Sequence, residues 1–125
     1  MAYDVHIVRT NDWLGAGSDP IEKTDVDLIV EADPELTWST TDFVDMADDS
    51  GAVTRYFMIR WRGDSDFWWY RDQVLCSSPT EAHLVKLVQI ARALKARVLG
   101  DDGESYDLKK GLFGGEKLVT TPPAA

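Results

Sequence analysis

The chain has 125 residues, a formal net charge of −9, 44% hydrophobic residues and a single cysteine. This length predicts one domain with its own core, and one cysteine excludes an intrachain disulfide. No apolar run approaches the roughly 18 residues that a membrane span needs, and the first residues show no signal-peptide pattern. We therefore expect a cytoplasmic protein that has no membrane partner.

Negative charge is concentrated in the first part of the chain. Residues 1–50 hold 13 acidic residues against 2 basic ones, a net of −11, whereas residues 51–125 hold 9 against 11, a net of +2. An acidic half repels nucleic acid and anionic lipid and attracts a basic protein. The alternative is that these charges only keep the protein soluble.

The first third of the chain predicts a strand, a loop and a helix. Residues 3–10 alternate between apolar and polar side chains, which favours a strand. Residues 11–20 hold Asn, Asp, two Gly, Ser and Pro, which predicts a loop. Thr24 and Asp27 resemble a capping box, so we expect a helix over 22–32.

The middle of the chain predicts a strand, a turn and a β-hairpin. Residues 36–44 are rich in Thr and aromatic residues and favour a strand, and the Asp-rich residues 45–51 favour a turn. Two further strands, over 52–62 and 67–76, flank a turn at 63–66. This hairpin is the clearest supersecondary unit in the sequence.

The last third predicts a long helix and a short strand. Ser78 as N-cap, followed by Pro79, indicates a helix over 78–96. Residues 97–99 then favour a short strand. The chain ends in a segment with several glycines and a Thr-Thr-Pro-Pro-Ala-Ala sequence, over 111–125, which is typical of a loose tail.

Together these elements predict an α+β fold, in which an antiparallel sheet of four to five strands has two helices packed on one face. We expect residues 1–110 to form a single α+β domain. Residues 111–125 would be a Gly- and Pro-containing C-terminal tail.

The sequence has no recognisable metal or cofactor motif. His6 and His83 are far apart, and neither has a Cys or His at ligand spacing. The Asp-rich turns at 48–51 and 101–104 resemble calcium loops, but an apolar residue would fall at the first ligand position of each. There is no phosphate-binding loop. We expect no metal and no cofactor.

Cys76 is the one candidate nucleophile. It lies at an expected strand end just before a helix, where the helix N-terminus lowers a thiol pKa, and His83 lies one turn into that helix. A small enzyme that uses Cys76 or an acidic cleft is therefore one alternative. The other interpretation is that Cys76 is a small apolar core residue, because no third catalytic group is identifiable.

The aromatic residues of the expected hairpin suggest a binding surface. Trp68 and Trp69 are adjacent in a strand, so their side chains point to opposite faces. The outer one, with Tyr56 and Arg60, would give an open sheet face the composition of an interface hot spot. Such a face also suits single-stranded nucleic acid, but the acidic charge argues against that partner. The alternative is that these side chains only stack on one another.

Two segments carry a resemblance to known proteins. The Tyr-Asp-Val-His-Ile sequence at 3–7 and the Arg-Val-Leu-Gly-Asp-Asp-Gly-Glu sequence at 97–104 resemble a group of small bacterial proteins of unassigned function. In size, acidity and lack of catalytic motif, the chain is also similar to immunity proteins of bacterial toxin systems. This second resemblance implies a protein partner and assigns no residues.

We therefore expect a non-enzymatic protein-binding domain, with an immunity-type antidote that neutralises a toxin as one form of it. Its partner would be another protein of basic character, with no nucleic acid involved. Asp45, Asp48 and Asp49 would attract the partner, and the exposed member of the Trp68 and Trp69 pair would anchor it. A structural or assembly module is the remaining alternative.

Overall fold

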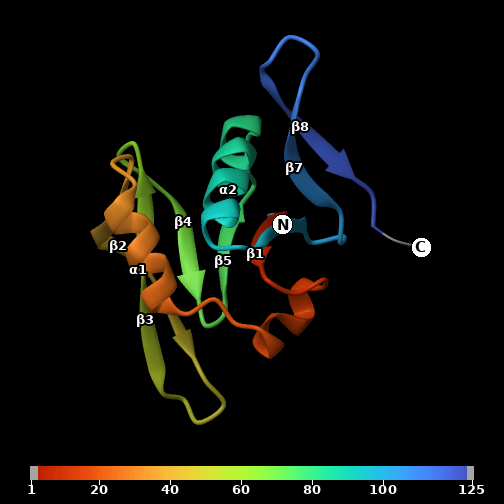
Figure 1. Ribbon diagram of the computed structural model, residues 1–125. Helices are drawn as coiled ribbons and strands as arrows, with labels where there is room; N and C mark the ends of the chain where they lie inside the picture. Colours follow the sequence, from red (N-terminus) through yellow and green to blue (C-terminus); the bar gives the residue numbers. More distant parts are fainter. Residues whose placement is uncertain (1–2, 124–125) are drawn as a thin grey trace.

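The computed structural model describes residues 3–123. These residues form eight strands, two α-helices and one 3₁₀-helix (Figure 1). In chain order the elements are β1 (Asp4–Val8), η1 (Trp13–Ser18), α1 (Lys23–Ala32), β2 (Leu36–Ala47), β3 (Val53–Trp61), β4 (Asp64–Tyr70), β5 (Gln73–Ser77), α2 (Glu81–Ala93), β6 (Arg97–Gly100), β7 (Ser105–Lys110) and β8 (Glu116–Thr121).

The strands form one antiparallel sheet in the order β2-β3-β4-β5-β1-β6-β7-β8. The fold is α+β, but the expected sheet of four to five strands with two helices is wrong, because the described residues form eight strands and three helices. The main difference is the β7–β8 hairpin. Residues 116–121, which the sequence places in a loose tail, pair with β7 in register from Ser105↔Thr121 to Lys110↔Glu116.

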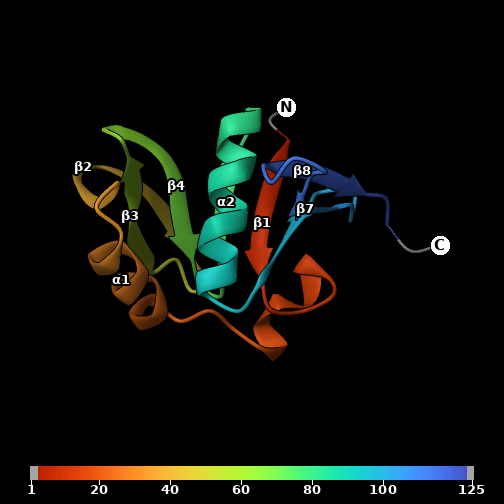
Figure 2. The ribbon, with the colours of Figure 1, turned by 45° about the horizontal axis from the view of Figure 1, so that its top comes forward.

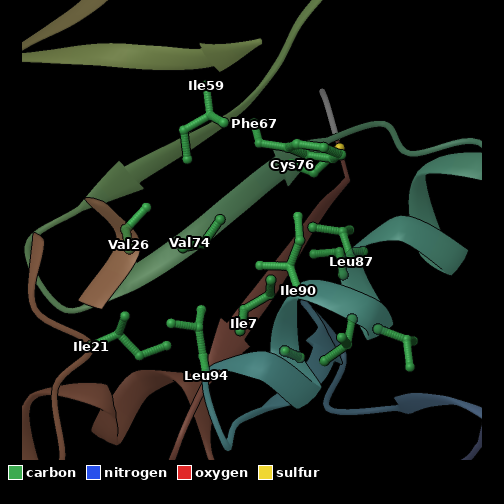
Figure 3. Packing of buried hydrophobic residues seen from close by; sticks show 14 of the residues in the cluster. Ile7, Ile21, Val26, Ile59, Phe67, Val74, Cys76, Leu87, Ile90 and Leu94 are labelled. Carbon is green, nitrogen blue, oxygen red and sulfur yellow. The ribbon is translucent and has the colours of Figure 1, made fainter. Parts of the chain in front are cut away.

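One face of the sheet carries the main core, because α1 and α2 both pack there. Figure 2 shows both helices on the same side of the strands. Apolar residues of β1, β3, β4 and β5 alternate inward and meet the apolar stripe of α2, as Figure 3 shows for Ile7, Phe67 and Leu87, each fully buried. Burial of a Phe or Leu side chain contributes about 1.5–3 kcal/mol, so this layer holds the two halves of the chain together.

The opposite face carries a smaller cluster under η1. Val8, Ala16 and Leu99 are buried there, and Trp13 packs against them. The composition of residues 11–20 predicts a loop; instead the segment forms the 3₁₀-helix, which begins with the Asp12 carboxylate accepting from the Leu14 N–H.

Both α-helices exist where the sequence predicts them, but their first residues differ. In α1 the Asp25 carboxylate accepts the Glu22 N–H, so Asp25 rather than Asp27 closes the first turn. In α2 the N-cap is Thr80, not Ser78, and the Thr80 hydroxyl accepts the N–H of His83 at 3.3 Å.

Two hairpins project from opposite ends of the molecule. The β2–β3 hairpin ends in the turn at 48–52, and the β7–β8 hairpin ends in the turn at 111–115 (Figure 1). Strands β2 and β8 are the two edges of the sheet. With seven strand spacings of about 4.8 Å between them, these edges are separated by roughly 34 Å measured along the sheet.

Candidate partner-binding site

The candidate site lies where β3 separates from β4. The pairing of these strands ends at Met58↔Trp68, whereas the pairing of β2 with β3 continues to Ala47↔Val53. The outer part of the β2–β3 hairpin is therefore a two-stranded projection with no third strand beside it. Over Val53–Phe57, the edge of β3 that faces away from β2 is therefore not paired with another described strand.

A β-bulge in β2 shapes this region. The register with β3 shifts between Trp38 and Phe43, and the buried Ser39 lies within the shift. The Ser39 hydroxyl oxygen accepts the N–H groups of Thr41 and Asp42 at 3.2 and 2.8 Å. Because the bulge satisfies these groups internally, β2 bends without leaving them unpaired.

A cavity of about 260 Å³ opens at this bend, and we call it the hairpin groove. Four of its lining side chains are aromatic, which gives it apolar walls. The lining residues are Lys23, Trp38, Ser39, Thr54, Arg55, Tyr56, Phe57 and Trp69. Apolar walls with a few polar groups are typical of a binding pocket.

Apolar side chains continue from the hairpin groove toward the tip of the hairpin. Phe43 and Phe57 face each other across the strands, with ring centroids 6.0 Å apart, and remain 42% and 40% exposed. Val53, nearer the tip, is 63% exposed. The Arg55–Asp45 ion pair lies between Val53 and the two rings, so the apolar surface next to the groove is the Phe43–Phe57 pair, and exposed aromatic side chains beside a groove are typical of an interaction surface.

Each cation at the hairpin groove is neutralised by a carboxylate of its own. Lys23 donates to Asp27 at 2.9 Å, and Arg55 donates two parallel hydrogen bonds to Asp45 at 2.9 and 3.0 Å. The Arg55 guanidinium also lies 3.6 Å from the centroid of the Phe43 ring. The hydrogen bonds from Arg55 lower the pKa of Asp45, so this carboxylate stays ionised and paired with Arg55.

The three predicted acidic residues therefore differ in what they can do. Asp45 lies in β2 rather than in a turn and is paired with Arg55. Asp48 accepts the N–H groups of Ser50 and Ala52, and the Ser50 hydroxyl is the main cause of its lowered pKa. In the part of the chain that the structure describes, Asp48 and Asp49 are both exposed and without an ion pair, but only Asp49 has a carboxylate that accepts no hydrogen bond, so it is the most available of the three to a partner.

The structure brings three of the four predicted surface aromatics and cations together. Tyr56 lies with its ring centroid 6.3 Å from Trp68 and 5.6 Å from Trp69. Trp69 points to the helix-covered face, where its Nε1–H donates to the Ile21 carbonyl at 2.8 Å, and it lines the hairpin groove. Arg60 is separate, because its guanidinium donates back to the Gly63 carbonyl of its own turn.

The Cys76 thiol is enclosed in the core (Figure 3). Burial, with the nearby charges of Asp66 and Asp4, raises its pKa to about 12. His83 does not bond to it in the described structure: its Nδ1 accepts the Thr80 N–H, and its Nε2 donates to Asp66 at 2.9 Å. A protonated, buried thiol without a base is a poor nucleophile.

The second histidine is part of a structural network on the other face. His6 is 3% exposed and stacks on Trp13, with ring centroids 4.3 Å apart. Its two ring nitrogens lie 2.6 Å from Gln73 Oε1 and 2.7 Å from Asp101 Oδ1. These contacts hold the ring between Gln73 of β5 and Asp101, which follows β6.

Sequence reasoning missed most of the hairpin groove. Phe43 and Phe57 lie in two expected strands that pair with each other, and two aromatic residues at opposite positions of such a pair indicate a cross-strand contact. Trp38, Ser39 and Lys23 converge only because β2 bends at the bulge and α1 begins beside it. No local pattern in the sequence specifies that bend.

Within residues 3–123 no three or more His, Cys, Asp or Glu side chains gather as they would around a metal ion. No helix of that range is long and apolar enough to cross a lipid bilayer. Comparison of the chain with protein-family models, with curated proteins and with solved structures finds no match.

Proposed function

We propose that this chain is a non-enzymatic protein-binding domain, and that the hairpin groove receives an apolar side chain from a basic segment of its partner. The observation that carries the proposal is the groove itself, a cavity of about 260 Å³ with aromatic walls beside the exposed Phe43 and Phe57. Large aromatic side chains around a pocket are the usual anchors of protein interfaces.

The charge around the groove supports a basic partner. The hairpin over 42–55 holds four Asp residues and one Arg, a net of −3. Because Lys23 and Arg55 already bind carboxylates of this chain, they leave the field of the hairpin acidic. Complementary charge mainly accelerates association and selects the partner, while the apolar contacts supply most of the affinity. A toxin with a basic surface, held by an immunity-type antidote, is one partner of this chemistry.

Peptide display from a random library tests the proposal, because selection reveals which side chains the hairpin groove prefers. Selection would use the full chain, with counterselection on a Phe57→Arg variant, which removes the ring and adds a repelling charge at an exposed position. We expect the recovered peptides to share an aromatic or aliphatic side chain next to Lys or Arg. Peptides that are acidic, or that bind the variant equally well, would contradict the proposal.

The matched control is Leu28→Ser. Leu28 is 66% exposed on α1, and it does not line the hairpin groove. The selected peptides should bind this variant as they bind the parent chain. Asp49→Lys should slow association without changing stability, since Asp49 caps nothing, whereas substitution of Asp48 would also disrupt the turn.

A further inference from the structure

The most exposed apolar residues of the described chain lie at the tip of the β7–β8 hairpin. Leu112 is 98% exposed and Phe113 is 102% exposed. Gly111 and Gly115 close the turn around them through the Gly111 N–H, which donates to the Gly115 carbonyl at 2.6 Å. We call residues 109–117 the lysine finger. A fully exposed Leu-Phe pair at a defined turn is unfavourable in water and indicates a surface that becomes covered.

The lysine finger is a basic segment of an acidic protein. It holds three Lys and one Glu, a net of +2, and its Glu116 is already paired with Arg92 at 3.0 Å. Lys109 and Lys117 are direct cross-strand partners, and within the described residues neither has an ion pair. Like charges directly opposite each other in a sheet are destabilising, so an anionic partner would relieve this arrangement.

We infer that the lysine finger of one copy of this chain inserts into the hairpin groove of a second copy. The inference rests on the proposed function, because it names the finger as an occupant of that groove. The finger and the hairpin over 42–55 have opposite net charges, +2 and −3, and both present exposed apolar side chains.

The dimensions of the two surfaces agree. A cavity of about 150 Å³ holds a benzene molecule in other proteins, so the groove of about 260 Å³ accommodates the Phe113 ring with room for part of Leu112. Leu108 is the last buried residue before the tip. At about 3.3 Å per residue, the finger extends roughly 13 Å beyond it, which allows insertion before the two bodies meet.

Insertion must be intermolecular. The finger belongs to the β7–β8 edge of the sheet and the groove to the β2–β3 edge, and Figure 1 shows the two hairpins pointing away from each other. A contact between two different patches is head-to-tail, so two joined copies still have one free groove, on the copy whose finger is inserted, and one free finger, on the other copy. The chain would therefore form short open chains or a closed ring, with the association weakening as salt screens the opposite charges.

Complementation between two variants tests this inference. One variant, Leu112→Ser with Phe113→Ser, lacks the finger, and the other, Phe57→Arg, lacks the groove. We expect the parent chain to show concentration-dependent association by sedimentation velocity, and each variant alone to associate at least about tenfold more weakly. A mixture of the two should form heterodimers and stop there, since only one finger and one groove remain intact.

Three results would overturn the inference: a parent chain that stays monomeric at millimolar concentration, association that survives in both variants, or variants that fail to complement each other. Cosedimentation of the monomer with anionic phosphatidylserine vesicles, lost in the finger variant, would assign the finger to a membrane surface instead. A parent chain that stays monomeric but still selects basic peptides through Phe57 would reject the self-contact and leave the proposed function standing.

Discussion

Gly100 and Glu104 offer a sharp test of how the β6–β7 turn is held. The Glu104 carboxylate folds over Gly100, so that a Cβ added at Gly100 would lie well inside van der Waals contact with it. There the carboxylate accepts from the hydroxyls of Tyr3 and Tyr106, the second at 2.9 Å. Burial alone would raise the pKa of Glu104, but these hydrogen bonds outweigh it and lower the pKa.

Gly100→Ala should therefore act through Glu104 and not through the backbone. The φ angle of Gly100 is outside the left-handed region, so alanine fits the main chain. The added methyl group would displace the carboxylate and cost its hydrogen bonds. Hydrogen bonds to a charged group contribute about 1.5–3 kcal/mol each, and because Glu104 can reach water, we expect a net loss of about 1–3 kcal/mol.

The assay is urea unfolding of the parent, Gly100→Ala, Glu104→Ala and the double variant. Glu104→Ala removes the three atoms nearest to the added methyl group, so in that background Gly100→Ala should change the free energy of unfolding by no more than about 0.5 kcal/mol. Spectrophotometric titration should also bring the Tyr3 pKa down from about 12 in both single variants. An equal cost of Gly100→Ala in both backgrounds would refute the reasoning.

Three further predictions concern titration and the core. Hydrogen bonds from Lys86 and Arg62 lower the pKa of Glu35 from 4.5 to about 2, so the stability that they add is complete above about pH 4.5 and is lost as the pH falls toward 2. In a plot of the urea unfolding midpoint against pH, Glu35→Gln should therefore show a smaller decrease between pH 4.5 and 2 than the parent chain. Parallel curves for the two proteins would contradict this. Burial raises the pKa of the Cys76 thiol to about 12, so at pH 7 this thiol should react with a disulfide reagent only as fast as the chain unfolds. Complete reaction within seconds would show instead that the thiol is accessible in the folded chain. Lys86→Met should lower the free energy of unfolding, measured by thermal unfolding, by only about 1–2 kcal/mol. The carboxylates of Asp33 and Glu35 lie 2.6 and 3.0 Å from the Lys86 ammonium and are partly exposed, so water can solvate them when the ammonium is removed. A loss above about 4 kcal/mol would contradict this.

Elements with strong local patterns could be predicted from the sequence. The expected strand over 52–62 is β3, because its apolar residues alternate and a Gly turn follows it. The expected single strand over 67–76 is two strands, β4 and β5, with a turn at 71–72 between them. The apolar residues that repeat at helical spacing likewise predict that α2 is a helix. Its start could not be predicted, because the Ser78 N–H donates to the Tyr3 carbonyl and Ser78 has a φ of 50°, which is not the extended backbone of an N-cap, so Thr80 caps the helix.

Features that depend on distant contacts could not be predicted. The glycines over 111–115 suggest a tail, but they form the turn of a hairpin whose Leu108 is buried against the core. Asp45 has the composition of a turn, but its bidentate contact with Arg55 keeps it in β2. The hairpin groove depends on a β-bulge and on the start of α1 beside it, and neither position is specified by neighbouring residues.

The most direct test of the central claim uses the tryptophan indole N–H signals in a ¹H–¹⁵N correlation spectrum of the full chain. The probe is a capped Lys-Phe-Lys peptide, with Glu-Phe-Glu and Lys-Ser-Lys as controls for charge and ring. If the hairpin groove binds an apolar side chain in a basic setting, Lys-Phe-Lys should shift the signals of Trp38 and Trp69, which line it, and leave Trp13 on the opposite face unmoved. Equal shifts with the control peptides, or shifts confined to Trp13, would contradict the account.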